Sequence, residues 1–430
     1  MSNILNFSIF GKENSGKCSL NKAINLYIKD LSHPKDFVYN NRKYHIFPIP
    51  CFGQDFKDNF DISIKNSDFI LITIDSKAIN DINKDSNYYS HLILLSIING
   101  IKNIIFVLTK ILDKDGNNII TNNDIEKIKT FMEDLYYKIK IKLGLNNENI
   151  QFDFCTVDSL DGNGIEELLS KFPISIINNK NDNNNQLSLL GLYDKYADKE
   201  REEFVITCKI YNEIKQNNIN INETKLNIYY IDDKTNTMNI INEVMPYKLA
   251  LADGEYIEKL NNIENQFISL KFKLNSLKED FINNPLRNCF LSFSQNDENI
   301  CFFDTCEADI IISSLLSDEV LKEKAFTVLT KGCKCIFSNY NIDIECTIIN
   351  IFGEYENNHN NLIKKKIINC KNGITSKIVI NLSRPILSTK FDLCNKFGSF
   401  RLLKNGKNFA LGKIIRKVNI IINNINFCNR

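Results

Sequence analysis

The residues from 11 to 18 constrain the fold of this chain more than any other stretch. They are Gly-Lys-Glu-Asn-Ser-Gly-Lys-Cys, and they match the phosphate-binding pattern G-x-x-x-x-G-K-[S/T] at every position except the last. An apolar run at 5–10 precedes them, and a helical pattern at 18–29 follows them. Because a phosphate-binding loop of this type joins a strand to a helix, the sequence predicts a P-loop domain with a mostly parallel sheet.

Each part of this loop has its own chemical task. Glycines let backbone N–H groups gather around phosphate oxygens, Lys17 adds positive charge, and the following helix adds its N-terminal dipole. The last position normally holds Mg²⁺ through a hydroxyl oxygen, whereas Cys18 offers a thiol. Since Mg²⁺ prefers hard oxygen ligands, we expect a phosphate site with weakened Mg²⁺ binding, and we predict no metal ligand. The nucleotide-binding residues predicted from this loop are Gly11, Asn14, Ser15, Gly16, Lys17, Cys18 and Ser19.

Composition excludes several classes of protein. The 430 residues carry a net charge of +1, so no overall attraction to nucleic acid or to a membrane surface is expected. No apolar run is long enough to cross a membrane and no signal-peptide pattern opens the sequence, so we expect a cytoplasmic protein without membrane contact. The 13 cysteines and 4 histidines lack metal-binding spacing, and the thiols are expected to be reduced.

The hydrophobic pattern changes at about residue 204. Before it, short apolar runs alternate with amphipathic stretches, which is typical of an α/β domain, here 1–180. After it, short alternating runs separated by polar turns predict two small β-barrels, 204–322 and 323–430. A polar tract predicts a linker at 181–203. The fold class is therefore an α/β P-loop domain followed by two small β-barrels.

The same periodicities place the individual elements. A helical stretch at 317–324 is expected between the two barrels. The strands expected in the first domain are 5–10, 44–49, 69–74, 104–108 and 152–157, with helices at 18–29, 88–98, 124–143 and 164–171. The strands expected in the barrels are 204–210, 226–231, 267–274, 289–293, 309–313, 333–337, 343–349, 377–380 and 409–415.

The C-terminal residues carry a resemblance to a known family. Residues 397–402 (FGSFRL) and 406–413 (GKNFALGK) are similar to the closing stretch G-R-F-x-L-R … G-x-T-x-A-x-G of the elongation factor 1-alpha family of translational GTPases. Ser399 and Asn408 stand where that family has Arg and Thr. The order of one P-loop domain and two barrels also resembles this family, so the resemblance covers nearly the whole chain.

The resemblance implies a degenerate switch region. The family's DxxG element corresponds to 50–53, where Gly53 would contact the γ-phosphate and Pro50 replaces the Asp that orders the Mg²⁺ shell. The next residue, Gln54, stands where the family has the His that orients the attacking water; it either does that work, as the one catalytic residue expected, or is an ordinary turn residue. The segment between Lys29 and Tyr44 lacks the Gly-Ile-Thr of switch I.

The resemblance also implies where a guanine base would be read. The family's N-K-x-D corresponds to 109–112, and Leu112 cannot accept hydrogen bonds from the base as the family's Asp does. Asp113 could substitute if the loop shifted by one residue. We therefore expect GTP or GDP to bind weakly or not at all. The other nucleotide-binding residues implied are Gly53, Thr109, Lys110, Asp113, Asp158, Ser159 and Leu160.

Function follows from the branch of the family that the chain resembles. Residues 330–332 (TKG) and 384–386 (RPI) are most similar to the Hbs-type ribosome-rescue branch, and the release-factor GTPase branch is second. This implies a ribosome-bound factor whose barrels hold a Pelota-like or release-factor-like protein, with RNA contact through basic residues of the last barrel. The alternatives are a slow active GTPase, a carrier of aminoacyl-tRNA, and an interaction module outside translation.

Overall fold

The structure is a computed structural model, and it describes most of the chain in separate ranges. These are residues 5–28, 36–40, 42–46, 63–77, 86–113, 116–142, 151–173, 189–210, 219–220, 225–232, 234–251, 256, 259–260, 267–283, 289–292, 300–312, 329–340, 342–355, 362–363, 369–370, 374–404 and 407–418. No helix in these ranges is long and apolar enough to cross a membrane.

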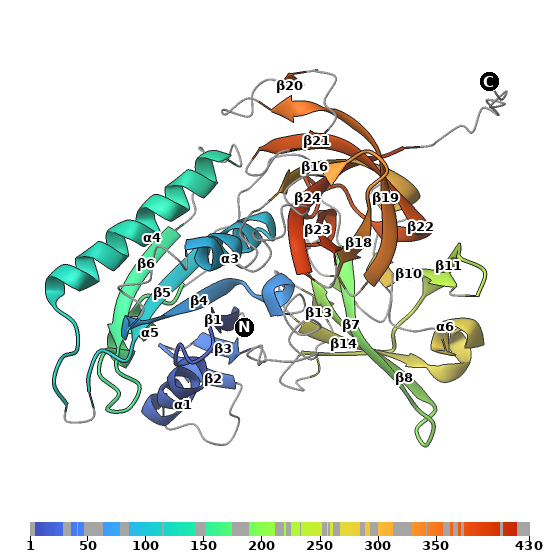
Figure 1. Cartoon of the computed structure of the whole chain (residues 1–430). Helices are drawn as coiled ribbons and strands as arrows, with labels where there is room; N and C mark the ends of the chain where they lie inside the picture. Colours follow the sequence, from blue (N-terminus) through green and yellow to red (C-terminus); the bar gives the residue numbers. More distant parts are fainter. Residues whose placement is uncertain are drawn as a thin grey trace, which may run out of the picture.

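The N-terminal domain is an α/β sandwich around a six-stranded sheet with the order β2-β3-β1-β4-β5-β6 (Figure 1). Every neighbouring pair is parallel except β2 and β3, which are antiparallel. The strands are β1 (Leu5–Gly11), β2 (Asp36–Tyr39), β3 (Arg42–Ile46), β4 (Phe69–Asp75), β5 (Asn103–Thr109) and β6 (Gln151–Val157). The helices are α1 (Lys17–Ile28), α3 (Ser86–Ile98), α4 (Asn122–Lys142) and α5 (Ile165–Ser170).

Helices cover both faces of this sheet, which explains why its central strands are mostly apolar and almost entirely buried. Every residue of β1 and β5 is buried. On one face, α1 and α5 share a hydrophobic cluster with the strands, and on the other face α3 and α4 share a second one. The five strands and four helices expected from the sequence are all present within a few residues. The short β2 was not predicted.

The middle part is a seven-stranded antiparallel sheet with the order β11-β10-β15-β7-β8-β14-β12, curled around its own hydrophobic core. Its strands are β7 (Leu189–Asp198), β8 (Glu203–Ile210), β10 (Leu226–Asp232), β11 (Thr237–Val244), β12 (Lys248–Leu251), β14 (Phe267–Lys273) and β15 (Cys289–Ser292). A short pair, β9 (Ile219–Asn220) and β13 (Lys259–Leu260), a 3-10 turn (Leu274–Ser276) and α6 (Glu279–Asn283) complete the described elements.

This sheet corrects the predicted linker at 181–203. Strand β7 lies inside that range and pairs with both β8 and β15. Strands β11 and β12 were also missed, because polar residues interrupt the alternation of β11 and β12 has only four residues; both strands gain stability from their neighbours in the sheet.

The last part is a closed barrel. The sheet order is β18-β23-β24-β16-β22-β19-β20, and β18 also pairs with β19, so the strands from β18 to β19 form a ring. These strands are β16 (Cys301–Ile312), β18 (Lys334–Asn339), β19 (Ile342–Tyr355), β20 (Leu362–Ile363), β22 (Thr375–Ser388), β23 (Ser399–Lys404) and β24 (Lys407–Lys417). Smaller elements are β17 (Leu329–Thr330), β21 (Asn369–Cys370) and α8 (Asn395–Gly398).

The position of β16 corrects the predicted boundary between the barrels. This strand was assigned to the middle barrel, 204–322, but it pairs with β22 and β24 at the centre of the last sheet. The change of sheet therefore falls between β15 and β16, earlier than residue 323. A strand's partners lie far away along the chain, so its local sequence could not reveal which sheet it joins. The helix expected at 317–324 lies outside the described residues.

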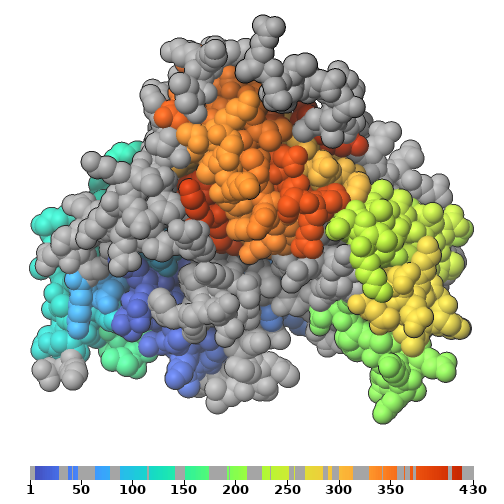
Figure 2. Space-filling model, turned by 45° about the vertical axis from the view of Figure 1, so that its right-hand side comes forward, coloured from blue at the N-terminus to red at the C-terminus, as the bar shows by residue number. Residues whose placement is uncertain are grey.

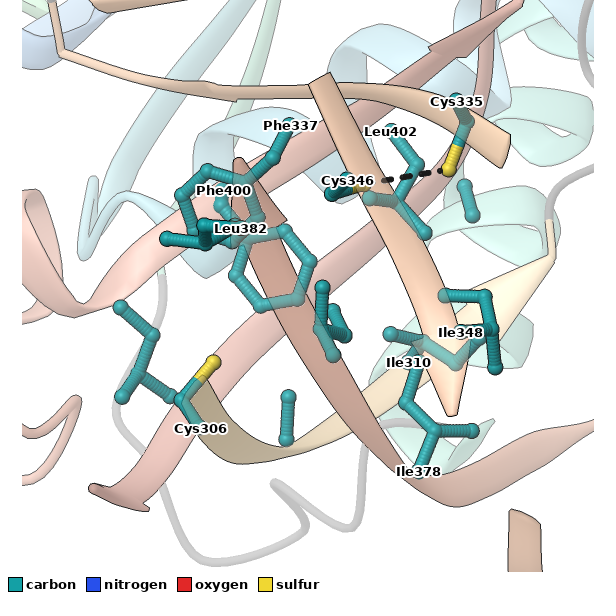
Figure 3. Packing of buried hydrophobic residues seen from close by; sticks show 14 of the residues in the cluster. Cys306, Ile310, Cys335, Phe337, Cys346, Ile348, Ile378, Leu382, Phe400 and Leu402 are labelled. Atoms are coloured by element: carbon teal, nitrogen blue, oxygen red, sulfur yellow. Dashed lines mark hydrogen bonds between the residues drawn. The ribbon is translucent and has the colours of Figure 1, made fainter. Parts of the chain in front are cut away.

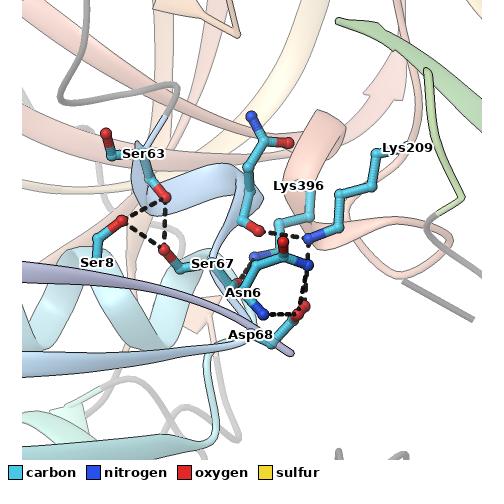
Figure 4. Close-up of polar contacts among 8 residues, drawn as sticks. Asn6, Ser8, Ser63, Ser67, Asp68, Lys209 and Lys396 are labelled. Atoms are coloured by element: carbon cyan, nitrogen blue, oxygen red, sulfur yellow. Dashed lines mark hydrogen bonds and ion pairs between the residues drawn. The ribbon is translucent and has the colours of Figure 1, made fainter. Parts of the chain in front are cut away.

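A buried charge network joins the first two parts of the molecule (Figure 4). The carboxylate of Asp68, just before β4, accepts hydrogen bonds from the backbone N–H of Asn6 at 2.8 Å and from its side-chain amide at 2.9 Å. The ammonium group of Lys209, on β8, lies 3.2 Å from the same carboxylate and also donates to the Asn66 carbonyl. Both side chains of this ion pair are almost fully buried, 1% exposed for Lys209 and 5% for Asp68.

The last barrel also contacts the first domain near this network; in Figure 2 the last barrel (orange to red) lies above the first domain (blue to cyan) and the middle sheet (green to yellow). Lys396 of α8 donates to the Ser67 carbonyl at 2.9 Å, and the Ser399 hydroxyl donates to Asn99, just after α3, at 3.0 Å. Ile311 and Leu411 of the last barrel belong to the hydrophobic cluster under α3 and α4. The last barrel is therefore packed against the first domain through both polar and apolar contacts.

A histidine of the first domain lies close to Arg401 of the last barrel. His91 is on α3, and its Nδ1 atom is buried with no hydrogen-bond partner among the described residues. Burial, helped by the nearby charge of Arg401, lowers the pKa of His91 to about 3. His91 is therefore neutral at physiological pH.

Candidate nucleotide-binding site

The phosphate-binding loop connects the end of β1 to the start of α1, as the sequence predicted. A Cβ atom on Gly11 would lie only 2.1 Å from the Thr73 hydroxyl and 2.4 Å from the Ser15 hydroxyl, so only glycine fits there. Asn14 and Gly16 have φ angles of 59° and 85°, in the left-handed region. The glycines at both ends of the motif thus allow the tight course of this loop.

Hydroxyl groups from the neighbouring strands tie the loop in place. The Ser15 and Thr73 hydroxyl oxygens lie 2.6 Å apart, and Thr73 donates to the Phe10 carbonyl at 3.0 Å. Thr109, at the end of β5, lies 2.8 Å from the Ser15 carbonyl and 3.1 Å from the Ile74 carbonyl. Thr109 was predicted to contact a base; its hydroxyl lies against the loop backbone.

Lys17 lies under the loop. Its ammonium group donates to the Gly11 carbonyl at 2.8 Å and to the Lys12 carbonyl at 2.6 Å, and the residue is only 8% exposed. A phosphate that bound above the loop would therefore compete with these carbonyl oxygens for the lysine's hydrogen bonds. The cradle and its charge are present together at the N-terminus of α1, which is the arrangement that favours an anion.

The metal position of the motif does not suit Mg²⁺. Cys18 and Ser19 are both exposed on the first turn of α1, and the polar atom of Cys18 is a soft thiol sulfur. Within the described ranges, no group of three or more Cys, His, Asp or Glu side chains could hold a metal ion. Gly53 and Gln54, together with Pro50, lie outside the described residues.

In the loop after β5, the charged side chains of Lys110 and Asp113 already have partners. Lys110 has a φ of 58° and its ammonium group forms an ion pair with Asp75 at 2.6 Å. Asp113 accepts hydrogen bonds from Asn117, through the backbone N–H at 2.9 Å and the side-chain amide at 3.4 Å. Its carboxylate is therefore engaged in closing its own loop, and Leu112 has no polar side-chain atom to replace it.

The third predicted element, residues 158–160, is only partly exposed. Asp158 is 2% exposed, and its carboxylate accepts the backbone N–H of Leu160 at 2.9 Å and that of Leu112 at 3.4 Å. The Ser159 hydroxyl is buried and has no partner within the described ranges, while Leu160 is 88% exposed. Asp158 therefore connects the two loops that were predicted to contact a guanine base, the loop at 109–113 and the loop at 158–160.

Sequence reasoning missed two residues of this site. Thr73 and Asp75 lie at the carboxyl end of β4, beside the loop and beside Lys110. The rule that ligands bind at the carboxyl ends of parallel strands could have identified both, because β4 was predicted and ends at Asp75.

Comparison with known proteins gives one match to a family model. The model described as "GTP-eEF1A C-terminal domain-like" matches residues 320–415, which cover most of the last barrel. No curated protein matches the chain.

Solved structures of translation factors resemble the chain over almost its whole length. Translation elongation factor SelB from Methanococcus maripaludis, in its apo form, is 15% identical, with a TM-score of 0.59 over 98% of this chain and 81% of that chain. SelB in complex with the GTP analogue GppNHp is 16% identical, with a TM-score of 0.61 over 98% of this chain and 80% of that chain. Sup35 complexed with GDP is 14% identical and covers 97% of this chain and 95% of that chain, with a TM-score of 0.40.

The likeness to SelB shows the fold. The predicted fold class, a P-loop domain followed by two β-barrels, is therefore confirmed by the sheet topology and by this likeness.

Proposed function

We propose that this protein is a translation factor of the GTPase family that works on the ribosome, in the rescue of stalled ribosomes or in termination, with a weakened or lost nucleotide cycle. The observation that carries the proposal is the shared architecture with SelB along the whole chain, combined with the match of residues 320–415 to the GTP-eEF1A C-terminal domain-like model. Such a factor would work in the cytoplasm.

The state of the candidate site supports the weakened cycle. Lys17 is engaged by carbonyl oxygens of its own loop, and Cys18 presents sulfur where Mg²⁺ needs oxygen. The Asp113 carboxylate already accepts hydrogen bonds from Asn117, and Leu112 has no polar side-chain atom, so neither of these two described residues offers a ready acceptor to guanine. A buried polar partner that is missing costs about 1–3 kcal/mol of binding. The weakened contacts to Mg²⁺ and to guanine favour a protein that acts on the ribosome as a scaffold over one that hydrolyses GTP.

If a nucleotide binds, the residues of the loop would hold its phosphates. The backbone from Gly11 to Lys17 and the α1 N-terminus supply hydrogen-bond donors, and Lys17 supplies charge once it leaves the two carbonyl oxygens. The residues present do not fit a tightly held Mg²⁺, and we derive no hydrolysis step through one. Gly53 and Gln54 keep their proposed roles toward the γ-phosphate and the attacking water.

The barrels are the proposed docking surface for a Pelota-like or release-factor-like protein. The basic residues suggested for RNA contact differ in their availability. Arg401 is 9% exposed, with a guanidinium nitrogen 3.3 Å from the Ser338 hydroxyl, so it does not offer its charge to a partner. Arg416 pairs with Glu307 at 2.8 Å while its side chain stays 65% exposed. RNA contact would therefore rest on Arg416, Lys404, Lys413 and Lys417, with Lys407.

A nucleotide titration of the purified protein tests the proposed cycle. GTP, GDP and ATP would be titrated with and without Mg²⁺ by calorimetry, and we expect weak or absent binding that Mg²⁺ does not improve. Tight, Mg²⁺-dependent binding of GTP over ATP would contradict the weakened cycle. A pull-down from cell extract tests the proposed place of action. We expect ribosomes together with one tRNA-shaped protein partner, and recovery of neither would remove the ribosomal function.

The second candidate function is a slow active GTPase, favoured by the intact loop and its lysine. Mg²⁺-dependent release of phosphate from GTP that disappears in the Lys17→Ala variant would support this candidate. The Lys12→Ala variant is a matched control, because Lys12 contributes a backbone carbonyl to the site and that atom is unchanged. A third role, carriage of aminoacyl-tRNA, would require protection of the ester bond from hydrolysis.

A further inference from the structure

Two cysteines of the last barrel face each other across a hairpin (Figure 3). Cys335 lies on β18 and Cys346 on β19, and the antiparallel register places them directly opposite each other. Their sulfur atoms are 3.3 Å apart, and they are separated by 11 positions along the chain. This is the only pair of thiols in hydrogen-bond contact within the described part of the chain.

The backbone already has the spacing that a disulfide requires. Directly opposite residues of an antiparallel pair have Cα atoms about 4.5–5.5 Å apart, which lies within the range of about 4.4–6.8 Å seen in disulfides. The two sulfur atoms would need to approach from 3.3 Å to about 2.05 Å, a movement that side-chain rotation can supply. No rearrangement of the strands is needed.

The environment makes one of these thiols different from the other buried ones. The sulfur–sulfur hydrogen bond, in which either thiol can be the donor, lowers the pKa of Cys335 together with the charge of Lys404 and despite its burial. The same contact and burial raise the pKa of Cys346. Burial alone raises the pKa of Cys306, which lies in the same core. Cys335 is therefore the thiol of this core that most readily becomes a thiolate, with Cys346 placed to resolve it.

We propose that Cys335 and Cys346 form a reversible disulfide when the protein meets a hydroperoxide. A small oxidant is required, because Cys335 is 7% and Cys346 3% exposed, which excludes a bulky disulfide such as oxidised glutathione from direct attack.

The reaction takes two steps. The Cys335 thiolate attacks one oxygen of hydrogen peroxide, the O–O bond breaks, and hydroxide leaves, so that Cys335 becomes a sulfenic acid. The Cys346 sulfur then attacks the Cys335 sulfur, the S–O bond breaks, and the hydroxyl group leaves with the Cys346 proton as water. The hydroxide takes up the proton that Cys335 had released. The two thiols lose two electrons, and the peroxide gains them.

The disulfide would fasten a hairpin that also touches the other parts of the molecule. At its tip, Asn339 donates to the carbonyls of Phe397 and Ser399 at 2.7 and 2.9 Å. Tyr340, the next residue, donates through its hydroxyl to the Leu192 carbonyl of the middle sheet at 3.2 Å. Oxidation would thus stiffen the element that connects the last barrel to the middle sheet, and it would raise the midpoint of thermal unfolding by a few degrees.

Peptide mapping of the folded full chain tests the proposal. The reduced protein would be treated with hydrogen peroxide, its remaining thiols blocked with N-ethylmaleimide in denaturant, and its peptides identified by mass spectrometry. We expect a peptide pair joined through Cys335 and Cys346 that separates after treatment with dithiothreitol. If both thiols remain free to react with N-ethylmaleimide while exposed Cys18 is oxidised, the proposal is wrong.

Variants separate the roles of the sulfurs. Cys346→Ala should lose the linked peptides and leave a Cys335 sulfenic acid that dimedone captures. Cys306→Ala is the matched control, because Cys306 is buried in the same core while the sulfur–sulfur hydrogen bond joins Cys335 and Cys346, and it should keep the link. Cys333→Ser should also form the Cys335–Cys346 disulfide. If the disulfide is lost in this variant, Cys333 reacts with the peroxide first, and direct oxidation of Cys335 is wrong. In the wild type, peroxide should raise the thermal midpoint, and an unchanged midpoint with the link present would contradict the stiffening.

Discussion

Removing the positive charge from the buried junction should weaken the whole molecule. In the Lys209→Met variant the carboxylate of Asp68 stays buried between the first domain and the middle sheet without its ion-pair partner. Removing one partner of a buried ion pair lowers the free energy of unfolding by about 3–5 kcal/mol, because the other charge stays buried without compensation. Asn6 still donates two hydrogen bonds to the carboxylate. We therefore expect the free energy of unfolding to decrease by about 3 kcal/mol, near the lower end of this range.

Urea unfolding followed by circular dichroism, together with limited proteolysis, measures this loss. The exposed pair Lys225 and Glu243 supplies a matched control, because its atoms lie 2.6 Å apart while its side chains are 53% and 52% exposed. Lys225→Met should cost less than about 1 kcal/mol. The double variant Asp68→Asn with Lys209→Met should recover much of the loss, since the carboxylate and the ammonium group of this ion pair are then both absent. Equal losses in Lys209→Met and Lys225→Met would refute the argument from burial.

Three further predictions concern the loop and the domain contact. Gly11→Ala should destabilise the protein by about 2 kcal/mol or more, seen as a lower thermal midpoint, because its Cβ would overlap the Thr73 hydroxyl; a neutral result would mean that the loop relaxes freely. Thr109→Val should lower the free energy of unfolding, measured in urea, by about 1–2 kcal/mol, because the single hydroxyl proton shared by the Ser15 and Ile74 carbonyls is lost, whereas Thr121→Val on an exposed turn should lower it less. Since the pKa of His91 is lowered to about 3, the unfolded state binds more protons between that pH and about 6.5. The free energy of unfolding of the wild type should therefore decrease as the pH falls through that window. The decrease should be steeper than that of His91→Gln by up to about 1.4 kcal/mol per pH unit. If the free energies of unfolding of the two proteins change in parallel with pH, the prediction is wrong.

The structural features that depend on the local sequence pattern could be predicted from the sequence. The apolar runs of β4 and β5 identified the central strands, because strands covered on both faces are apolar throughout. The loop motif predicted the connection from β1 to α1, because its glycines and lysine have fixed spacing; the binding of phosphate there stays a prediction.

What the sequence did not reveal depends on partners far away along the chain. Strand β16 was assigned to the middle barrel although it pairs within the last one. Arg401 is one of the basic residues of the last barrel for which RNA contact was expected, but it is buried beside residues of the first domain such as Lys65 and Asn99. Lys209 gave no signal of burial, because a lysine becomes buried only when a second domain supplies its carboxylate.

The ring formed by the strands from β18 to β19 restricts how another protein can be recognised. A closed barrel has no free strand edge along that ring, so a visiting polypeptide cannot extend the sheet by adding a strand there. A partner must instead engage side chains and turns. In the described part of the middle sheet, β11 (Thr237–Val244) pairs with β10 alone, and the backbone along its outer margin is where an extended peptide could still be accommodated.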